Sequence, residues 1–201
     1  MWWCRPASRL LWQSLIISCF VLVVFLFFTQ AMGDRTLEYF LRLNQLTKQD
    51  AAEIRWSHAV NNRRALTEAL TGRTHMIEAD VILRGHDPKE PVMAHPPDND
   101  SDITLNEWLQ EVKVYNKGIK LDFKSLEAVS PSLVLLKDVL AELSPPVWIN
   151  ADILCGPGGK AKPLDSEAFL FAVMTLPAHI TLSLGWTTGW TSAAENPGEN
   201  T

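Results

Sequence analysis

Two acidic residues two positions apart could do chemistry in the stretch from His75 to Leu83. Apolar residues alternate along this stretch, and the pattern predicts a strand, so Glu78 and Asp80 would share one face. Two carboxylates on one face of a buried strand repel each other, so a cation, a nearby lysine or a shared proton must neutralise them. The alternative for such a pair alone is a solvated strand face.

The next two predicted strands carry matching polar faces. These faces hold Lys120, Asp122 and Lys124 in the strand 118–124, and Trp148, Asn150 and Asp152 in the strand 147–154. Carboxylates from neighbouring strands (Glu78, Asp80 and Asp122) are suited to a hard divalent cation, Mg²⁺ or Ca²⁺, and the lysines to an anionic substrate. A charge-balanced network of lysines and aspartates without a metal is the alternative.

Two histidines stand near these strands. His58 lies at the end of a first strand, predicted over 54–60, and His95 lies in the connection that follows the second. Two imidazoles that titrate near neutral pH are suited to act as a general acid and a general base. Taken singly, a histidine of either kind more often has a structural role.

Predicted strands and helices alternate along the chain, and these elements would position the residues named above. Strands are predicted to begin near residues 54, 75, 118, 147 and 180, with helices over 36–46, 61–70, 131–143 and 165–175 and a helix opened by the capping box Thr104–Glu107. This α/β alternation predicts a parallel sheet, and the connection 84–102 is predicted to be a long loop. A glycine-rich phosphate loop is missing after the first strand, which disfavours dinucleotide binding.

We therefore expect a (β/α)₈ barrel of the TIM type. Such barrels need about 250 residues. The sequence predicts only the N-terminal portion of one, about five strands over 54–190, followed by a polar tail at 191–201. We therefore expect the chain to be a fragment of a longer protein, a truncated isoform or a chain that requires a partner.

Residues 10–32 form an apolar run that predicts a transmembrane signal anchor. Arg5 and Arg9 lie in the short tail 1–9, so this tail is expected to be cytoplasmic. The lead-in helix segment 33–53 and the barrel are then expected to be extracellular or luminal. A signal peptide cleaved after Ala31, which would give a secreted protein, is the alternative. Asn99 begins an N-glycosylation sequon, and the net charge of −5 without any basic tract argues against nucleic-acid binding.

Several motifs together carry a resemblance to a known family. They are Trp56-Ser57-His58-Ala59-Val60-Asn61, Glu78-Ala79-Asp80-Val81, Ala94-His95-Pro96-Pro97, Gly118 to Lys124, Trp148 to Leu154 and Gly185-Trp186-Thr187-Thr188. In this order, over residues 37–190, they resemble the menorin family and within it the membrane-anchored branch. That family is similar to the phospholipase-C-like barrels, which include glycerophosphodiester phosphodiesterases and spider-venom phospholipase D toxins.

The resemblance implies roles for individual residues. It implies an acid/base pair at His58 and His95, metal ligands at Glu78, Asp80 and Asp122, and a phosphate-holding lysine at Lys124. The expected substrate-binding set is Lys120, Lys124, Asn150, Asp152 and Trp186. The chain departs from the pattern at Ala59, where many of these phosphodiesterases have an arginine after the first histidine.

Three functions follow as expectations. The first is a membrane-anchored phosphodiesterase-like protein that acts on a phosphodiester such as a lipid head group. The second is a non-catalytic cell-surface recognition protein of the menorin type, a dendrite-branching cue with a cell-surface protein partner. The third is an inactive truncated isoform, because later strands of a barrel would supply part of the site. For a chain truncated in this way we expect no activity of its own.

Overall fold

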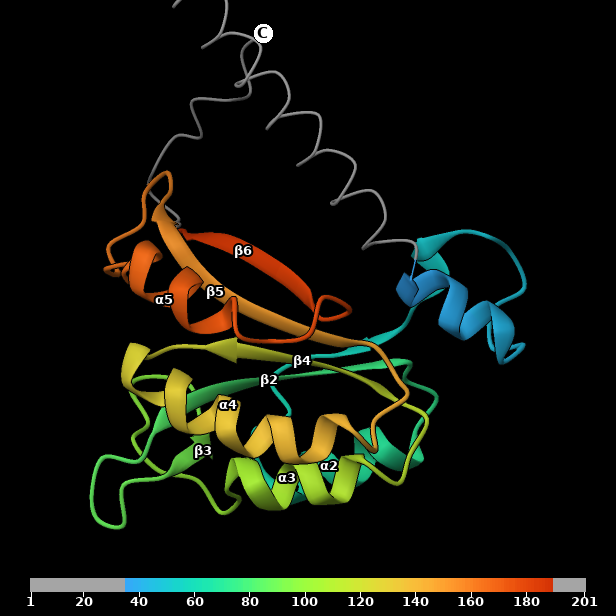
Figure 1. The fold of residues 1–201 in the computed structure, drawn as a ribbon, viewed down its shortest axis with the longest axis horizontal. Helices are drawn as coiled ribbons and strands as arrows, with labels where there is room; N and C mark the ends of the chain where they lie inside the picture. The colour runs from blue at the N-terminus through green and yellow to red at the C-terminus, as the bar shows by residue number, and fades with distance from the viewer. Residues whose placement is uncertain (1–34, 190–201) are drawn as a thin grey trace, which may run out of the picture.

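The computed structural model describes residues 35–189, which form one sheet with helices packed against it (Figure 1). The predicted tail 1–9, the predicted anchor 10–32 and the polar tail 191–201 lie outside the described residues. Within residues 35–189, every helix is too short or too polar to cross a bilayer.

Six strands and six helical segments make up this part of the chain. The strands are β1 (Trp56–Ser57), β2 (Met76–Leu83), β3 (Pro91–Met93), β4 (Gly118–Phe123), β5 (Val147–Cys155) and β6 (Thr181–Thr187). The helical segments are a helix over 35–42, the 3₁₀ helix η1 (Ala51–Glu53), α2 (Arg63–Thr71), α3 (Leu105–Val112), α4 (Leu126–Leu140) and α5 (Ser166–Val173).

The predicted parallel sheet is confirmed. Its strands lie in the order β1-β2-β4-β5-β6, which is also their order in the chain, and each neighbouring pair is parallel. The register between β2 and β4 runs from Met76 opposite Gly118 to Val81 opposite Phe123. Within residues 35–189 the sheet is open, because β6 lies at one end and β1 with β3 at the other. The α/β class and the parallel sheet of the predicted partial barrel are therefore confirmed, and the barrel itself stays a prediction.

The prediction of a loop throughout 84–102 is wrong at β3. Residues Pro91–Met93 pair antiparallel with β2, with Val81 opposite Met93 and Leu83 opposite Pro91. Three apolar residues are too few to show the alternation by which a strand is recognised. Pro91 also lacks an amide hydrogen, which a strand at the edge of a sheet can tolerate.

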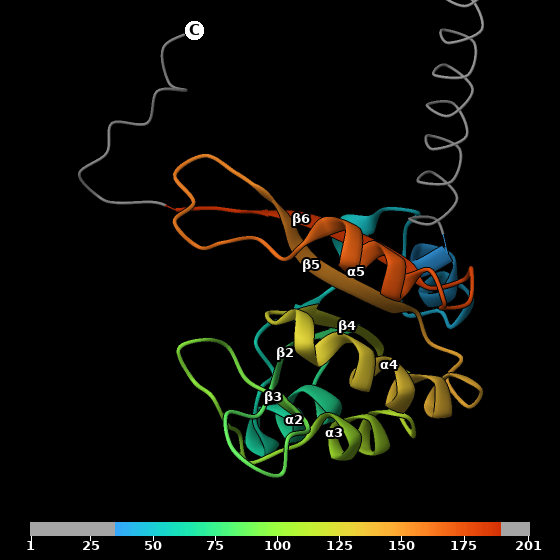
Figure 2. The ribbon, with the colours of Figure 1, turned by 60° about the vertical axis from the view of Figure 1, so that its left-hand side comes forward.

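One face of the sheet carries the main hydrophobic core. Inward residues of the strands, among them Ile77, Leu121 and Ile149, pack against α2 to α5, whose largest buried side chains are Trp108 and Phe169. Figures 1 and 2 show these helices side by side along this face. Burial of each such side chain contributes about 1.5–3 kcal/mol, so this core fixes the helix-facing side of β2, β4 and β5.

Local sequence signals set where the helices begin. The predicted capping box is present, because Thr104 accepts from the Glu107 backbone and the Glu107 side chain accepts from the Thr104 backbone. The predicted start of α4 at Pro131 is wrong, since the helix begins at Leu126 with Ser125 as its N-cap. Pro131 lies in the second turn, where burial of Val129 and Leu133 on the same helix outweighs the lost backbone hydrogen bond.

On its other face, the sheet is covered at the amino-terminal end by the lead-in segment. There Phe40 and Leu46 of the lead-in segment pack with Met76 and Trp148. Strand alternation puts Met76 on the same face as Glu78 and Asp80. The lead-in segment therefore covers the amino-terminal end of the face that carries Glu78 and Asp80. Beyond them on β2, Ile82 packs in a separate small cluster with Val92 and Ala94.

Candidate metal centre

Glu78 and Asp80 point away from the helices, as the alternation along β2 predicts. Ile77, Ala79 and Val81 lie in the helix-facing core, so the two carboxylates share the opposite face. Each is only 2% exposed. A buried carboxylate is costly unless other charges or hydrogen bonds compensate it, so the surroundings of this pair determine what it can do.

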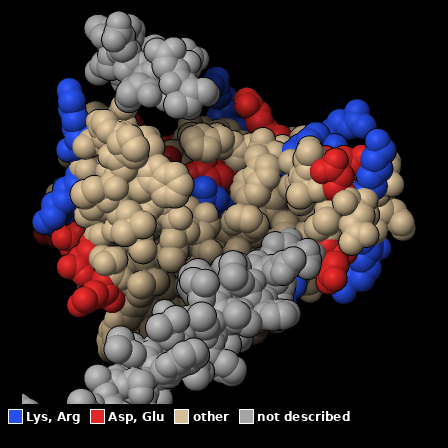
Figure 3. Space-filling model, turned by 90° about the horizontal axis from the view of Figure 1, so that it is seen from above, with Lys and Arg blue, Asp and Glu red and all other residues tan. Residues whose placement is uncertain are grey.

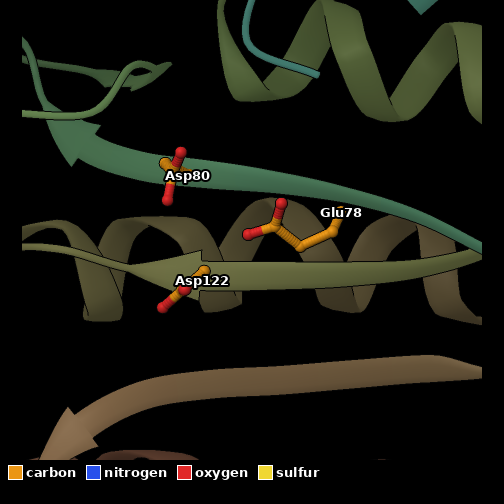
Figure 4. Close-up of side chains that lie close together, drawn as sticks. All are labelled: Glu78, Asp80 and Asp122. Carbon is orange, nitrogen blue, oxygen red and sulfur yellow. The ribbon is translucent and has the colours of Figure 1, made fainter. Parts of the chain in front are cut away.

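A third carboxylate comes from β4. Asp122 lies opposite Asp80 in the sheet register, and one oxygen from each of Glu78, Asp80 and Asp122 lies within 4.8 Å of the other two. Figure 4 shows the three side chains grouped on the adjacent strands β2 and β4. Because Ca²⁺–oxygen bonds are about 2.3–2.6 Å long, two ligands of one ion can be about 5 Å apart. The three oxygens are therefore close enough for a single cation.

Lys124 compensates two of the three carboxylates. Its Nζ lies 3.3 Å from Asp80 Oδ1 and 2.8 Å from Asp122 Oδ2. Burial by itself would lower the pKa of Lys124, but the hydrogen bond and charge of Asp122, together with the charge of Asp80, outweigh it and raise that pKa. The side chain therefore stays an ammonium ion within the cluster.

Two amides hold the aspartates in place. Asn150 Nδ2 donates to Asp122 Oδ1 at 2.7 Å. Asn61 Nδ2 donates to Asp80 Oδ2 at 2.7 Å, and Asn61 Oδ1 accepts from the Asp80 backbone N–H at 2.8 Å. These bonds fix the carboxylate planes, so the aspartates are oriented before any ligand arrives.

Glu78 is less completely compensated. Its Oε2 accepts from the Ala59 backbone N–H at 2.8 Å and lies 3.4 Å from His58 Nε2. Its Oε1 is buried and has no hydrogen-bond partner among the described residues. Burial raises the pKa of Glu78 and the charge of Asp80 adds to the rise, while the Ala59 N–H and the charges of His58 and Lys120 oppose it. Glu78 is thus the member of the cluster with an unused ligand atom.

The backbone next to His58 is strained. Ala59 has a φ of 54°, in the left-handed region that residues with a Cβ rarely adopt. This conformation accompanies the hydrogen bond from the Ala59 N–H to Glu78. Strained backbone of this kind concentrates at functional sites, where the surrounding structure maintains it.

Of the two predicted histidines, His58 is the one that contacts a carboxylate of the cluster within residues 35–189. His58 is exposed over 80% of its side chain and its ring lies at the edge of the cluster, on Glu78. His95 is also exposed, and its Nδ1 lies 2.6 Å from the Pro96 carbonyl oxygen. Among the described residues, His95 forms no hydrogen bond or ion pair with His58 or with the three carboxylates.

The predicted substrate-binding residues divide in the same way. Lys124 and Asn150 contact the carboxylates, and Lys120 lies opposite Glu78 in the register. Asp152 lies farther along β5, opposite Gly185, and Trp186 on β6 is 56% exposed. Figure 3 shows acidic and basic atoms together in a hollow bordered by uncharged residues, on the side seen from above Figure 1.

Sequence reasoning missed Asn61 and the Ala59 amide as parts of the site. Asn61 was expected only as the start of a helix, but Asn62 is the N-cap of α2 and Asn61 is free to bind Asp80. The signal was present in the sequence, since two adjacent asparagines cannot both cap one helix. The role of a backbone N–H, in contrast, leaves no mark on residue type.

Comparison with known proteins places this site within one family. A model of the menorin N-terminal domain matches residues 50–201. Human Protein FAM151B is 53% identical to the chain over 168 residues. That alignment covers 83% of this chain and 61% of the human protein, so the chain spans less than two thirds of the length of this relative.

Proposed function

The chain belongs to the menorin family, and we propose that it carries a divalent-cation site of the phosphodiesterase type, which acts on a phosphodiester. The observation that carries this proposal is the buried cluster of Glu78, Asp80 and Asp122 with one unpartnered carboxylate oxygen. A protein that needed these residues only for stability would satisfy that oxygen or replace the side chain with an apolar one.

The donor set fits a hard cation. When ionised, the three carboxylates would carry three negative charges, of which Lys124 offsets one, and Lys120 lies opposite Glu78 in the sheet register. Oxygen-only ligands suit Mg²⁺ or Ca²⁺. Glu78, Asp80 and Asp122 would hold the ion, with Glu78 Oε1 as its free ligand atom. When bound, the ion would stabilise negative charge on the phosphoryl oxygens.

The side chains around the cluster supply the other roles. His58 would transfer a proton at the exposed rim, where its ring is held by Glu78 and remains open to a substrate. His95 would be its partner, with Nε2 free because Nδ1 faces the Pro96 carbonyl. Lys120, Lys124, Asn150 and Asp152, with Trp186 at the rim, would bind the phosphate and the group attached to it.

The same proposal includes a barrel. Parallel strands in chain order, with their helices on one face, are the arrangement of consecutive units of a (β/α)₈ barrel. The polar face would then be its interior, and the site would lie toward the carboxyl ends of the strands, as in barrel enzymes. We further propose that the domain is extracellular or luminal behind the anchor at 10–32.

A second candidate function rests on Lys124. Its ammonium group already contacts both Asp80 and Asp122, which gives the cluster an internal cation. A scaffold with this feature could serve as a non-catalytic cell-surface recognition protein, in which the charged cluster is structural. Cation-dependent binding of a phosphodiester separates the two candidates.

The test uses the full chain in a non-ionic detergent and glycerophosphocholine as the probe. Because the chain spans 61% of the length of a relative, binding is the first readout and hydrolysis the second. The phosphodiesterase proposal predicts calorimetric binding in the presence of Ca²⁺ or Mg²⁺ that is abolished by a chelator.

Two matched variants sharpen this test. Any hydrolysis should be lost in His58→Asn and retained in His86→Asn, which replaces an exposed histidine that contacts Asp100 rather than the cluster. Binding that is unaffected by the chelator would remove the metal-dependent proposal. No binding at all, in a chain that remains folded, would favour the recognition role.

A further inference from the structure

A second cluster of charged residues lies at the other end of the sheet. His75 and Lys117 directly precede β2 and β4, whereas Asp80 and Asp122 lie near the carboxyl ends of these strands. Five strand residues span about 17 Å. A pocket of about 270 Å³ opens at this end, lined by Gln45, Arg55, His75, Lys117 and the loop 72–74. It is therefore separate from the metal centre.

This pocket is cationic and lacks a counter-charge. Arg55, Arg73 and Lys117 line it, and no acidic residue does. Among the described residues, none of the three forms an ion pair within 4.0 Å. Burial and the charge of Arg55 lower the pKa of Lys117, and burial with the charges of Arg55 and Lys117 lowers the pKa of His75. The like charges thus repel each other, and no carboxylate among the described residues pairs with them.

Part of the cluster has a structural role. Lys117 Nζ donates to the carbonyls of Gly72 and Thr74 at 2.8 and 2.6 Å, and Arg55 Nε donates to the carbonyl of Arg73 at 2.7 Å. These bonds satisfy the carbonyls that follow α2, which is an ordinary use of cations at a helix end. They also hold two cationic groups side by side at the pocket.

Arg73 has no such role. Its side chain forms no hydrogen bond within residues 35–189, yet it lines the pocket beside the other two cations. Arg73 is exposed, so its guanidinium group is available to a ligand in the pocket. A ligand with two negative charges and several acceptor oxygens would match the three cations, and guanidinium groups bind such ligands in bidentate fashion.

We propose that this pocket binds a small tetrahedral oxyanion, a phosphate or a phosphate monoester, through Arg55, Arg73 and Lys117. Gln45 in the pocket belongs to the lead-in segment 33–53, which follows the predicted anchor. Two ligands therefore offer the same phosphate chemistry to the pocket: the phosphate group of a lipid head group and free phosphate. The site does not depend on the metal centre or on the proposed function.

The experiment measures the thermal midpoint of the full chain in non-ionic detergent with a chelator present. Sodium phosphate is compared with sodium chloride at equal ionic strength, and phosphate should raise the midpoint more than chloride. Loss of one charge-assisted contact in Arg73→Gln should weaken apparent phosphate affinity about tenfold. Arg73→Lys should restore part of it.

The matched control is Arg64→Gln, which removes an arginine with 88% of its side chain exposed on α2. Equal effects of phosphate and chloride, or equal losses in Arg64→Gln and Arg73→Gln, would overturn the proposal. Dihexanoyl phosphatidic acid distinguishes the sources: tighter binding than phosphate points to a lipid head group, and equal binding to the oxyanion alone. An equal response to dihexanoylglycerol, which has the same acyl chains and no phosphate, would show acyl-chain binding and overturn phosphate recognition.

Discussion

Lys124 Nζ lies 2.8 Å from Asp122 Oδ2, so the cluster of carboxylates contains an ammonium ion of its own. The same Nζ lies 3.3 Å from Asp80 Oδ1, and the side chain of Asp80 is only 3% exposed. The cation site and its internal counter-ion therefore share ligands. A bound metal ion and Lys124 would compete for the aspartates or divide them.

Replacement of Lys124 tests this sharing. Lys124→Met leaves two buried carboxylates without their counter-charge, so it should lower the free energy of unfolding by about 3 kcal/mol in a chelator. Saturating Ca²⁺ should restore most of the loss, because the ion supplies the missing charge. Urea unfolding measures both values. Lys137→Met, at an exposed lysine on α4, is the control and should change stability by less than about 0.5 kcal/mol.

The raised pKa of Glu78 predicts a pH dependence of stability. Since the folded pKa lies above the ordinary value of 4.5, the folded chain binds more protons, and Glu78 lowers stability as pH rises from 4.5 through its folded pKa. Glu78→Gln cannot titrate, so its stability relative to the natural chain should increase across that window in a chelator. Urea midpoints measured from pH 4 upward check this. The prediction would be contradicted if the difference in urea midpoint between Glu78→Gln and the natural chain stayed constant with pH. It would also be contradicted if the exposed Glu68→Gln showed the same pH-dependent difference.

Strain at Ala59 predicts a stabilising substitution. Ala59→Gly keeps the N–H that donates to Glu78 and relieves the left-handed conformation, so stability should rise by about 1 kcal/mol. Ala168→Gly, on the exposed side of α5, should lower stability by about the same amount, because glycine weakens a helix. Chemical unfolding of both variants tests the opposite signs. A loss of stability in both would show that Ala59 carries no strain.

Glycosylation at Asn99 tests the orientation of the chain. Asn99 lies in a surface loop, next to Asp100, whose pKa is held at about 2 by hydrogen bonds from Arg84, the Ser101 backbone and His86. Expression in cells with a secretory pathway should give a glycan that a glycosidase removes, and Asn99→Gln should abolish it. Ser101→Ala is a poorer choice, because Ser101 also donates to the Asn61 carbonyl. An unmodified natural chain would contradict an extracellular or luminal domain.

Much of this site could be predicted from residue types alone. Alternation along β2 and β4 predicts that Glu78, Asp80 and Asp122 share a face, because period-two patterns decide which side of a strand is buried. The sheet register then brings the three together, as the structure confirms. The five parallel strands followed from the same alternation with helices between them.

Other features could not be predicted, for physical reasons. The antiparallel strand β3 is fixed by pairing with β2 across the loop, which is a long-range contact invisible to a local pattern. The start of α4 at Leu126 depends on tertiary burial that overrides the preference of Pro131 for a first turn. The contact of the His95 ring with the Pro96 carbonyl depends on loop conformation, which side-chain type does not determine.

Calorimetric titration of the full chain with Ca²⁺ and Mg²⁺ tests the central claim most directly. The account predicts saturable binding of one ion at the cluster of Glu78, Asp80 and Asp122, lost in Glu78→Gln and retained in the control Glu68→Gln, whose side chain is 72% exposed. Glu78→Gln is decisive because it removes the negative charge of the residue whose Oε1 has no hydrogen-bond partner within residues 35–189. Binding that is equal in both variants, or no binding by a folded natural chain, would contradict the account.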